Sequence, residues 1–411
     1  MTTFSCRASC QVAGRQHHLP ALRGWALVLL CTAACDRAPA PSAENHVQPV
    51  APTVFRLSEE PTLSIGVADG PEEHELFEIS GAARLADGSI VVYESGAFRV
   101  QKFGPDGEHL WSRGEQGEGP GDFLQFAELL VPCASEQSLV IHDQYNRRVT
   151  VFDGDGELLR AYAFDFQGAQ PRSITCAPGG RLVVSGWGKE WPTELGPHHT
   201  TADMAYADSS VVTILREDIP GEDRLRTDGG DAPGIWGRSL MFAATDSGIW
   251  LGRGDDYEIE FLDWSGTTTR RIRWEGPDLA VTQRHIDAYR EDLQDLYSNG
   301  LDWEHRVAGD GRDWRVRFEE RWERDREALP SVFPAYNRLM LADDGVLWIQ
   351  DYPKPGESAE WRAFADGGEW VRSLVLPTGA QLLDIGANWA LVQTRDDLDV
   401  ERLAVHMLVE D

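Results

Sequence analysis

The chain has few basic residues for its length. Its 411 residues include 38 Lys and Arg against 68 Asp and Glu, so the formal net charge at pH 7 is -30. A protein that binds nucleic acid needs a basic surface to neutralise phosphates, and no such footprint is visible in the sequence. We therefore expect no nucleic-acid partner, and we attribute the negative charge to solubility.

Signatures of common catalytic and metal sites are also missing. The sequence has no G-x-S-x-G segment, no H-x-x-x-H spacing and no C-x-x-C spacing, and the adjacent His198 and His199 are poorly placed to share one zinc ion. The Gly-rich segment RGEQGEGPGDF at 113–123 lacks the Lys and the Ser or Thr of a phosphate-binding loop. Its acidic residues would repel phosphate, and Pro120 has no N–H to donate. We therefore assign no zinc or phosphate site.

Acidic residues are absent from the first 35 positions. Arg7, Arg15 and Arg23 precede the apolar run WALVLLCTAA at 25–34. A positive region followed by about ten apolar residues is typical of a secretory signal and is too short to cross a bilayer. We interpret residues 1–35 as a signal peptide.

This segment ends in TAAC, at residues 32–35, which resembles the lipobox of bacterial lipoproteins. Thr32 stands where that family usually has Leu. The resemblance implies that Cys35 carries a lipid. It also implies that the protein is exported to the bacterial cell envelope and contacts the membrane through this anchor alone.

Cleavage elsewhere is the alternative to lipidation. The segment APA at 38–40 would suit an ordinary signal peptidase, but Pro39 and Pro41 flank that site unfavourably. Residues 36–52 are rich in Ala and Pro and show no apolar periodicity. They are predicted to form an extended linker before the folded domain.

Two stretches of the chain align with each other at a constant offset. Residues 87–110, DGSIVVYESGAFRVQKFGPDGEHL, match residues 136–159, EQSLVIHDQYNRRVTVFDGDGELL, at their apolar positions. Each unit has short alternating apolar runs separated by Gly, Asp or Pro turns, the pattern of antiparallel strands. Weaker copies occur at 177–187, 246–266, 343–368 and 386–408. The sequence therefore predicts six strand units.

Strand repeats of this period and aromatic content resemble the blades of β-propellers. The first unit with its Gly-rich extension is similar to NHL-type six-bladed propellers of bacterial secreted and lipid-anchored proteins. The resemblance implies an all-β six-bladed β-propeller over residues 53–411. It also implies that segment 113–123 links two blades, with Phe123 in the core between them. We expect residues 53–67 to complete the last blade and close the ring, because closure removes exposed sheet edges.

Long loops are predicted on one face. If the strands of a blade are named A to D from the channel outward, antiparallel pairing places the B–C loops and the D–A crossings on one face and the short A–B and C–D turns on the other. The first set includes 186–208, 352–360 and an insertion at 277–330. Apolar residues recur at helical spacing in this insertion, which predicts a small helical cap between blades four and five. We call this face the loop-rich face, and we expect function there.

The loop-rich face supplies the predicted ligand-binding residues. These are Glu94, Asp143, Trp187, Trp191, Asp255, Asp256, Asp351 and Tyr352. The carboxylates stand at the ends of B strands, where oxygen ligands could hold Ca²⁺ in the channel, as in gluconolactonase-like six-bladed enzymes. The chain matches no motif of those enzymes, and Asp143 matches an NHL position that stabilises the B–C turn. We therefore expect no cofactor or metal, with Ca²⁺ as the alternative.

Only two of the six cysteines lie beyond residue 35. Cys133 and Cys176 occupy matching positions in neighbouring predicted blades. An oxidising envelope would permit a disulfide if their Cα atoms lie within about 7 Å of each other. The sequence alone does not decide whether Cys133 and Cys176 form a disulfide.

Two functions from different classes remain. The first is a non-catalytic, envelope-anchored, monomeric propeller that binds a protein, peptide or glycan on its loop-rich face. The second is a metal-dependent lactonase or lyase with a divalent ion in the central channel, whose catalytic residues the sequence does not name. The missing catalytic motifs favour the first function, and the acidic residues around the channel keep the second open.

Overall fold

The structure is a computed structural model of the chain. The residues that it describes are 44–46, 51–124, 127–135, 138–163, 171–177, 180–187, 195–208, 211–227, 230–300, 311–396 and 398–411. The predicted signal peptide with Cys35 and the candidate Trp191 lie outside these ranges, so those predictions rest on the sequence.

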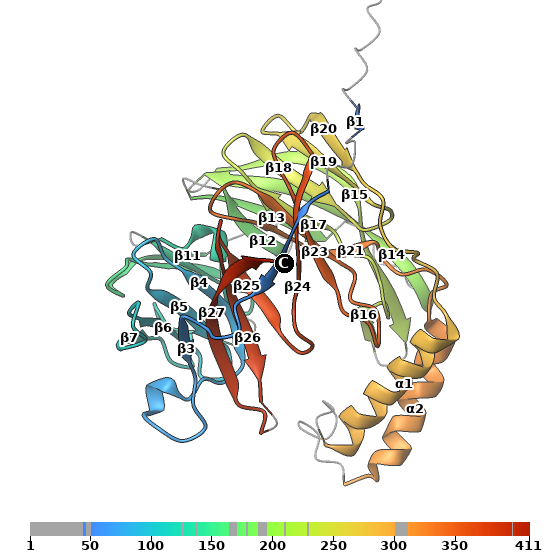
Figure 1. Cartoon of the computed structure of the whole chain (residues 1–411), viewed down its shortest axis with the longest axis horizontal. Coiled ribbons are helices and arrows are strands. Elements are labelled where there is room, and N and C mark those ends of the chain that lie inside the picture. The colour runs from blue at the N-terminus through green and yellow to red at the C-terminus, as the bar shows by residue number, and fades with distance from the viewer. Residues whose placement is uncertain are drawn as a thin grey trace, which may run out of the picture. The chain divides into compact units, whose positions relative to one another are not determined.

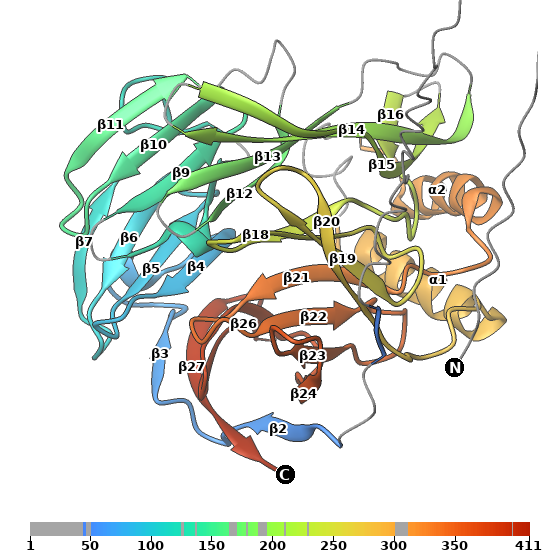
Figure 2. The same cartoon turned by 90° about the horizontal axis from the view of Figure 1, so that it is seen from above.

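The described residues form an all-β, propeller-like arrangement in which antiparallel sheets follow one another in chain order (Figures 1 and 2). The first sheet contains β4 (Ile79–Arg84), β5 (Ile90–Glu94), β6 (Arg99–Phe103) and β7 (His109–Arg113). The second contains β8 (Ala127–Leu129), β9 (Leu139–Asp143), β10 (Arg148–Phe152) and β11 (Leu158–Ala163). These two sheets contain the two repeats that align best in the sequence.

The next two sheets have five strands each. The third contains β12 (Pro171–Ala177), β13 (Arg181–Trp187), β14 (Gly196–Asp208), β15 (Val211–Thr227) and β16 (Gly230–Pro233). The fourth contains β17 (Met241–Ala244), β18 (Gly248–Gly252), β19 (Glu258–Asp263), β20 (Thr268–Arg273) and β1 (Glu44–His46). Strand β1 pairs parallel to β20 at the edge of its sheet, so part of the predicted linker is a short strand.

The remaining strands form one nine-stranded sheet. It combines two meanders, which are β21 (Tyr336–Leu341), β22 (Leu347–Asp351), β23 (Glu360–Phe364) and β24 (Trp370–Val375), then β25 (Gln381–Ile385), β26 (Trp389–Arg395) and β27 (Glu401–Glu410). Strand β2 (Thr53–Leu57) joins them, because it pairs with β24 on one edge and β27 on the other. The predicted six separate blades are thus seen as four separate sheets and one shared sheet.

The N-terminal strands complete the last meander. Strand β3 (Leu63–Ile65) pairs with the first half of β27, and β2 pairs with its final residues. Strand β27 is ten residues long and so offers enough backbone edge for both. This pairing agrees with the expectation that residues 53–67 complete the last strand unit.

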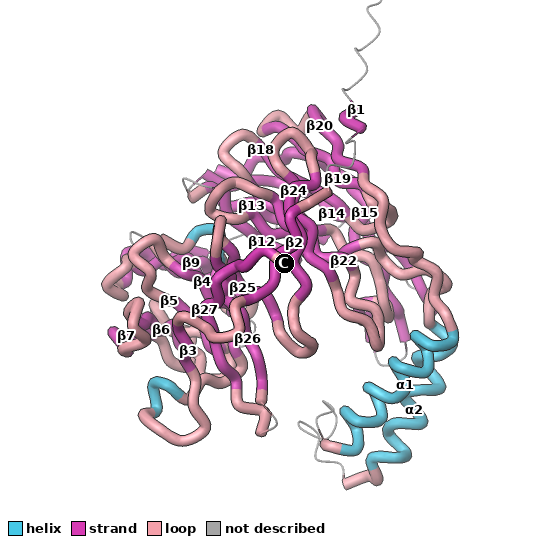
Figure 3. Tube along the Cα trace, viewed as in Figure 1, coloured by secondary structure: helices cyan, strands magenta, loops and turns pink. Residues whose placement is uncertain are grey.

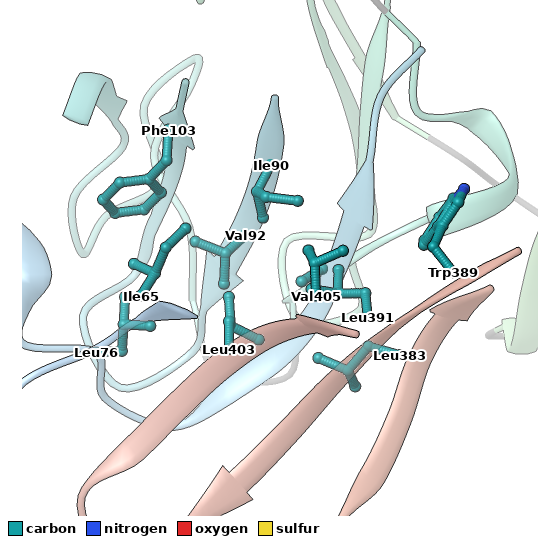
Figure 4. Close-up of a cluster of buried hydrophobic side chains, with 11 residues drawn as sticks. Ile65, Leu76, Ile90, Val92, Phe103, Leu383, Trp389, Leu391, Leu403 and Val405 are labelled. Atoms are coloured by element: carbon teal, nitrogen blue, oxygen red, sulfur yellow. The ribbon is translucent and has the colours of Figure 1, made fainter. Parts of the chain in front are cut away.

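The hydrophobic core lies between neighbouring sheets. Val92 and Phe103 of the first sheet belong to one buried cluster with Leu403 and Val405 of the last strand (Figure 4). Similar clusters fill the space between each later group of strands and the next. Because a sheet between two others is covered on both faces, β5 is buried along its whole length.

The Gly-rich segment 113–123 connects β7 to β8. Gly114 and Gly121 have φ values of 95° and 93°, which residues with a Cβ rarely adopt. A Cβ on Gly114 would lie 2.5 Å from the ring of Phe123. Phe123 is fully buried, and its ring meets that of Tyr93 edge-on with centroids 5.2 Å apart. The glycines are therefore explained by a bend that brings Phe123 into the core.

The described part of the insertion at 277–330 is helical, as predicted (Figure 3). Helix α1 (Gln283–Ser298) and helix α2 (Trp314–Ala328) pack through Leu293, Tyr297, Phe318 and Trp322, all of them buried. Short 3₁₀ turns, η1 (Glu72–His74) and η2 (Val131–Cys133), precede strands of the first two sheets. No helix of the described residues is both long enough and apolar enough to span a membrane.

A disulfide joins the segment between β8 and β9 of the second sheet to the third sheet. It links Cys133 at the end of η2 with Cys176 of β12, and their Cα atoms are 5.5 Å apart. Cys176 is fully buried. The two inner segments are thus close enough for the pairing that the sequence left open.

Removing this disulfide should weaken the fold measurably. The bond closes a loop with a sequence separation of 43 residues. We expect Cys133→Ala with Cys176→Ala to lower the free energy of unfolding by about 2 to 4 kcal/mol, chiefly through the entropy of the unfolded chain. Urea denaturation with and without a reductant measures this effect. The wild type should lose stability on reduction and the double variant should not; an equal response of both would contradict the assignment.

Candidate functional site

Glu94, the first predicted carboxylate of the loop-rich face, is fully buried at the end of β5. Its Oε1 accepts the backbone N–H of Phe77 at 3.0 Å, and its Oε2 accepts from Arg99 Nε at 3.0 Å and from Gln101. These donors come from the segment before β4 and from β6. Glu94 therefore holds the entry of the first sheet, and its oxygens already have protein partners.

Asp143 plays a similar part at the end of β9. It is fully buried, and it accepts the backbone N–H of Leu124 at 2.9 Å and that of Asn146 at 2.8 Å. The Asn146 side chain also donates to it at 2.8 Å and to the carbonyl of Gly117 at 3.1 Å. Asp143 and Asn146 thus tie the Gly-rich crossing to the turn after β9.

Asp351 and Asp255 are held by arginines. Asp351, at the end of β22, is buried and forms a two-pronged pair with Arg362, whose Nε and Nη2 donate to it at 3.0 and 2.8 Å. Asp255 is half exposed, and its Oδ1 lies 2.8 Å from Arg253 Nη1 and 3.3 Å from Arg238 Nη1. Both carboxylates are therefore neutralised within the chain.

Asp256 differs because no ion pair holds it among the described residues. Burial raises the pKa of its carboxyl above the ordinary value, and the nearby Glu258 and Asp255 raise it further, while Arg273 opposes them. No three His, Cys, Asp or Glu side chains of the described residues gather at a point where they could hold a metal ion. The acidic residues predicted for the channel are thus spread over separate contacts.

One of the predicted aromatic residues, Tyr352, lies at the base of the helical insertion. The ring of Tyr352 stacks on that of the fully buried Phe333, with centroids 5.7 Å apart. Burial raises the pKa of the Tyr352 hydroxyl to about 12. Phe333 also contacts Trp236, which meets Tyr289 of α1 edge-on. Tyr352 therefore packs the insertion against the sheets. Trp187 is the last residue of β13.

A cavity that the sequence did not predict lies among the inner strands. Its volume is about 1060 Å³, and it is lined by β4, β8, β12, β17, β21 and β25, the first strands of the strand units predicted from the sequence. The turns after β17 and β21 also line it, at residues 245–247 and 343–345. These are A–B turns, so the cavity reaches the face opposite the loop-rich face.

Four charged residues on the inner strands line this cavity, and three of them, Arg84, Arg338 and Asp384, are partly buried. The backbone N–H groups of Arg84 and Ile385 donate to Asp384, each at 2.9 Å. Burial nevertheless raises the pKa of the Asp384 carboxyl to about 7. The two N–H groups oppose this shift, Asp343 adds to it, and the charge of Arg84 opposes it. Asp384 is therefore a carboxyl that changes charge near neutral pH.

Two acidic residues of the turns that line the cavity are paired: Asp344 lies 2.8 Å from Arg372, and Asp366 lies 2.5 Å from Arg270. Glu128, on the inner strand β8, lies 3.6 Å from the ring of His142. This cavity was not predicted from the sequence, because the long loops indicated a site on the other face. A usable signal was present: NRLML in β21 places two polar residues, Asn337 and Arg338, in an inner strand that is otherwise rich in apolar residues.

Asp384 should make the stability of the protein depend on pH. Because its pKa in the folded chain lies above the ordinary 3.8, the folded state holds the proton more tightly, and stability falls as the pH rises from about 4 to 7. Between about pH 4 and pH 7, we expect the free energy of unfolding to fall by about 2 kcal/mol more in the wild type than in Asp384→Asn. This figure takes into account that water in the cavity reduces the effect of burial. Urea denaturation across this range measures it, with the exposed Asp246→Asn as control. Parallel curves for wild type and Asp384→Asn would contradict it.

Comparisons with known proteins address the fold only. No family model matches the sequence, and no curated protein matches it. Among solved structures, the chain is similar to a DUF4221 family member from Bacteroides vulgatus, at 9% identity and a TM-score of 0.49, over 87% of this chain and 99% of that one. It is also similar to a protein described as exported from Bacteroides fragilis, at 11% identity and a TM-score of 0.46, over 87% and 99% of the two chains.

A streptogramin B lyase is a further similar structure, at 9% identity and a TM-score of 0.41, over 85% of this chain and 97% of that one. Likenesses this remote carry no argument about activity or ligand. The propeller-like, all-β fold of this chain therefore stands on its own strand pairing.

Proposed function

We propose that the chain is an exported, lipid-anchored six-bladed propeller of NHL-like type that binds a protein, peptide or glycan on its loop-rich face without turning it over. Strands β21–β24 serve as the fifth blade. Strands β25–β27 with β3 serve as the sixth, and β2 links the two blades into one sheet. The arrangement of six first strands around one cavity supports this count.

One observation carries the non-catalytic function. Glu94, Asp143 and Asp351, the buried carboxylates of the loop-rich face, each accept from donors of their own chain. A metal-dependent lactonase or lyase needs several oxygen ligands turned toward one ion, and a proton-transfer enzyme needs a carboxylate poised at its substrate. Carboxylates held by Arg and backbone N–H groups suit neither task as they stand.

Exposed apolar side chains on the same face support binding. Phe77 before β4 is 56% exposed, Tyr145 after β9 is 61% exposed, and Leu398 after β26 is 79% exposed. The N–H of Ile79 donates to Glu401 at 2.8 Å, so the segments that carry Phe77 and Leu398 are neighbours. Apolar and aromatic side chains on neighbouring loops provide contact area for a partner.

Lipidation of Cys35 is tested by metabolic labelling, independently of binding on the loop-rich face. In a bacterial host, a clickable fatty-acid analogue should label the wild type and should not label Cys35→Ser, because the lipid is attached to this thiol. Cys31→Ser, four positions upstream, is the matched control and should keep the label. Equal labelling of both variants would contradict the lipid anchor and favour cleavage after residue 40.

Binding on the loop-rich face is tested by charge substitution. We expect Phe77→Asp with Leu398→Asp to weaken binding to peptide and glycan arrays, and photo-crosslinking to envelope partners, by about tenfold or more, since each loses buried apolar contact. Leu159→Asp with Val375→Asp, on the outer strands and 56% and 47% exposed in the wild type, is the control.

Two outcomes would contradict this function. One is an equal effect of both pairs of substitutions, which would remove the loop-rich face as the binding surface. The other is a stoichiometric divalent metal in the purified protein, together with lactonase or lyase turnover that Asp351→Asn abolishes.

A further inference from the structure

Arg338 of β21 is a partly buried cation that has no carboxylate partner among the described residues. Its Nη1 donates to the backbone carbonyl of Leu382 at 2.9 Å, and its guanidinium carbon lies 5.6 Å from the centre of the Trp361 ring. Burial lowers the pKa of the guanidinium, and no neighbouring charge counters this effect.

Such an arrangement is unusual on physical grounds. A buried charge costs a great deal of free energy unless an opposite charge or several hydrogen bonds compensate it. Arg remains protonated at all physiological pH values, so it cannot avoid this cost by losing its proton. Elsewhere in this chain, buried arginines such as Arg224 and Arg362 do have carboxylate partners. Arg338 therefore lacks the opposite charge that would compensate the cost of its burial.

A ligand in the central cavity can supply the opposite charge, because Arg338 lines this cavity. Its neighbour Asn337 also lines the cavity, and the buried Oδ1 of Asn337 has no hydrogen-bond partner in the described part of the chain. The oxygen and nitrogen of an Asn amide exchange places by a simple flip, so Asn337 can present N–H donors to a ligand. Two adjacent residues of β21 thus have unused hydrogen-bonding capacity.

Arg84 adds a second positive group to the same cavity. It sits at the end of β4, forms no ion pair with a described residue, and places its guanidinium 5.0 Å from the centre of the Trp389 ring. The residues that line the cavity also include the apolar Leu129, Leu240 and Phe242. A cavity of about 1060 Å³ with apolar walls and a few polar groups is of the size that holds small organic ligands.

We infer that the central cavity binds a small organic carboxylate, whose anionic oxygens accept from Arg338 and Asn337 and whose remaining part lies along the apolar wall toward Arg84. Guanidinium and carboxylate match in geometry, and their hydrogen bonds are strengthened by charge. The overall negative charge of the protein does not favour this ligand, so affinity has to come from these local groups. This inference does not depend on the proposed function of the loop-rich face.

Asp384 gives the site a pH dependence. Its carboxyl faces the backbone and charge of Arg84 on β4 and the charge of Asp343 in the turn after β21. The other acidic residues lining the cavity are Glu128, Asp246, Asp344 and Asp366. An anionic ligand is repelled by ionised Asp384 and tolerated by its protonated form. Affinity should therefore rise as the pH falls through the range in which Asp384 gains its proton.

Calorimetric titration of the full chain in detergent with succinate, citrate and benzoate tests the site. The wild type should bind at least one probe, and Arg338→Gln should weaken that binding by about tenfold or more. Arg372→Gln, which removes an arginine of β24 that is paired with Asp344 and does not line the cavity, is the control and should change affinity less than about twofold. Thermal unfolding gives a second readout: Arg338→Gln removes a partly buried charge that has no described carboxylate partner, so it should not lower the melting temperature.

Each possible result of these titrations has a distinct meaning for the inference. Binding that Arg338→Gln and Arg372→Gln reduce equally, or no binding of any probe below about 10 mM, overturns the inference. Inorganic phosphate that binds as tightly as the carboxylates would show a general anion site and overturn the carboxylate assignment. Phe77→Asp with Leu398→Asp should leave probe affinity unchanged, so failure of this site and failure of the loop-rich face are distinguished.

Discussion

The structure depends on one constraint: each sheet must bury both of its faces against its neighbours. For the first sheet this requires the last strand, because Val92 and Phe103 share a buried cluster with Leu403 and Val405. Backbone pairing of β2 and β3 with β27 holds the two ends of the domain together. Without that pairing, apolar faces of the first and last sheets would be open to water, and the edge of β27 would be unpaired.

The same constraint determines what the polar side chains do. A carboxylate at the end of a strand is covered by the next crossing, so it must find donors inside the chain. Glu94, Asp143 and Asp351 find them, and in doing so they position the crossings and turns of the loop-rich face. Arg338 is the opposite case, because its partly buried charge contacts one backbone carbonyl and one aromatic ring and has no carboxylate partner in the described part of the chain. This contrast separates groups that serve the fold from a group suited to a ligand.

Local regularities in the sequence predicted much of the fold. Alternating apolar residues and Gly turns predicted the first two sheets, helical spacing predicted α1 and α2, and the Gly-rich segment predicted the buried position of Phe123. The single nine-stranded sheet was not predictable in the same way. It arises because β2 meets both β24 and β27, and these strands are brought to one place only by the packing of the whole domain.

By itself the sequence determined the strand units, their turns and the contacts between near neighbours, such as Asp143 with Asn146, because steric preference and side-chain alternation act over a few residues. The interpretation of residues 1–35 as an export signal likewise comes from the sequence. Only the tertiary structure decided which distant residues share a site. The backbone of Arg84 meets Asp384, and Arg338 meets Leu382, because strands that are far apart in the chain surround one cavity. The charge that each group keeps there depends on burial, which no local pattern specifies.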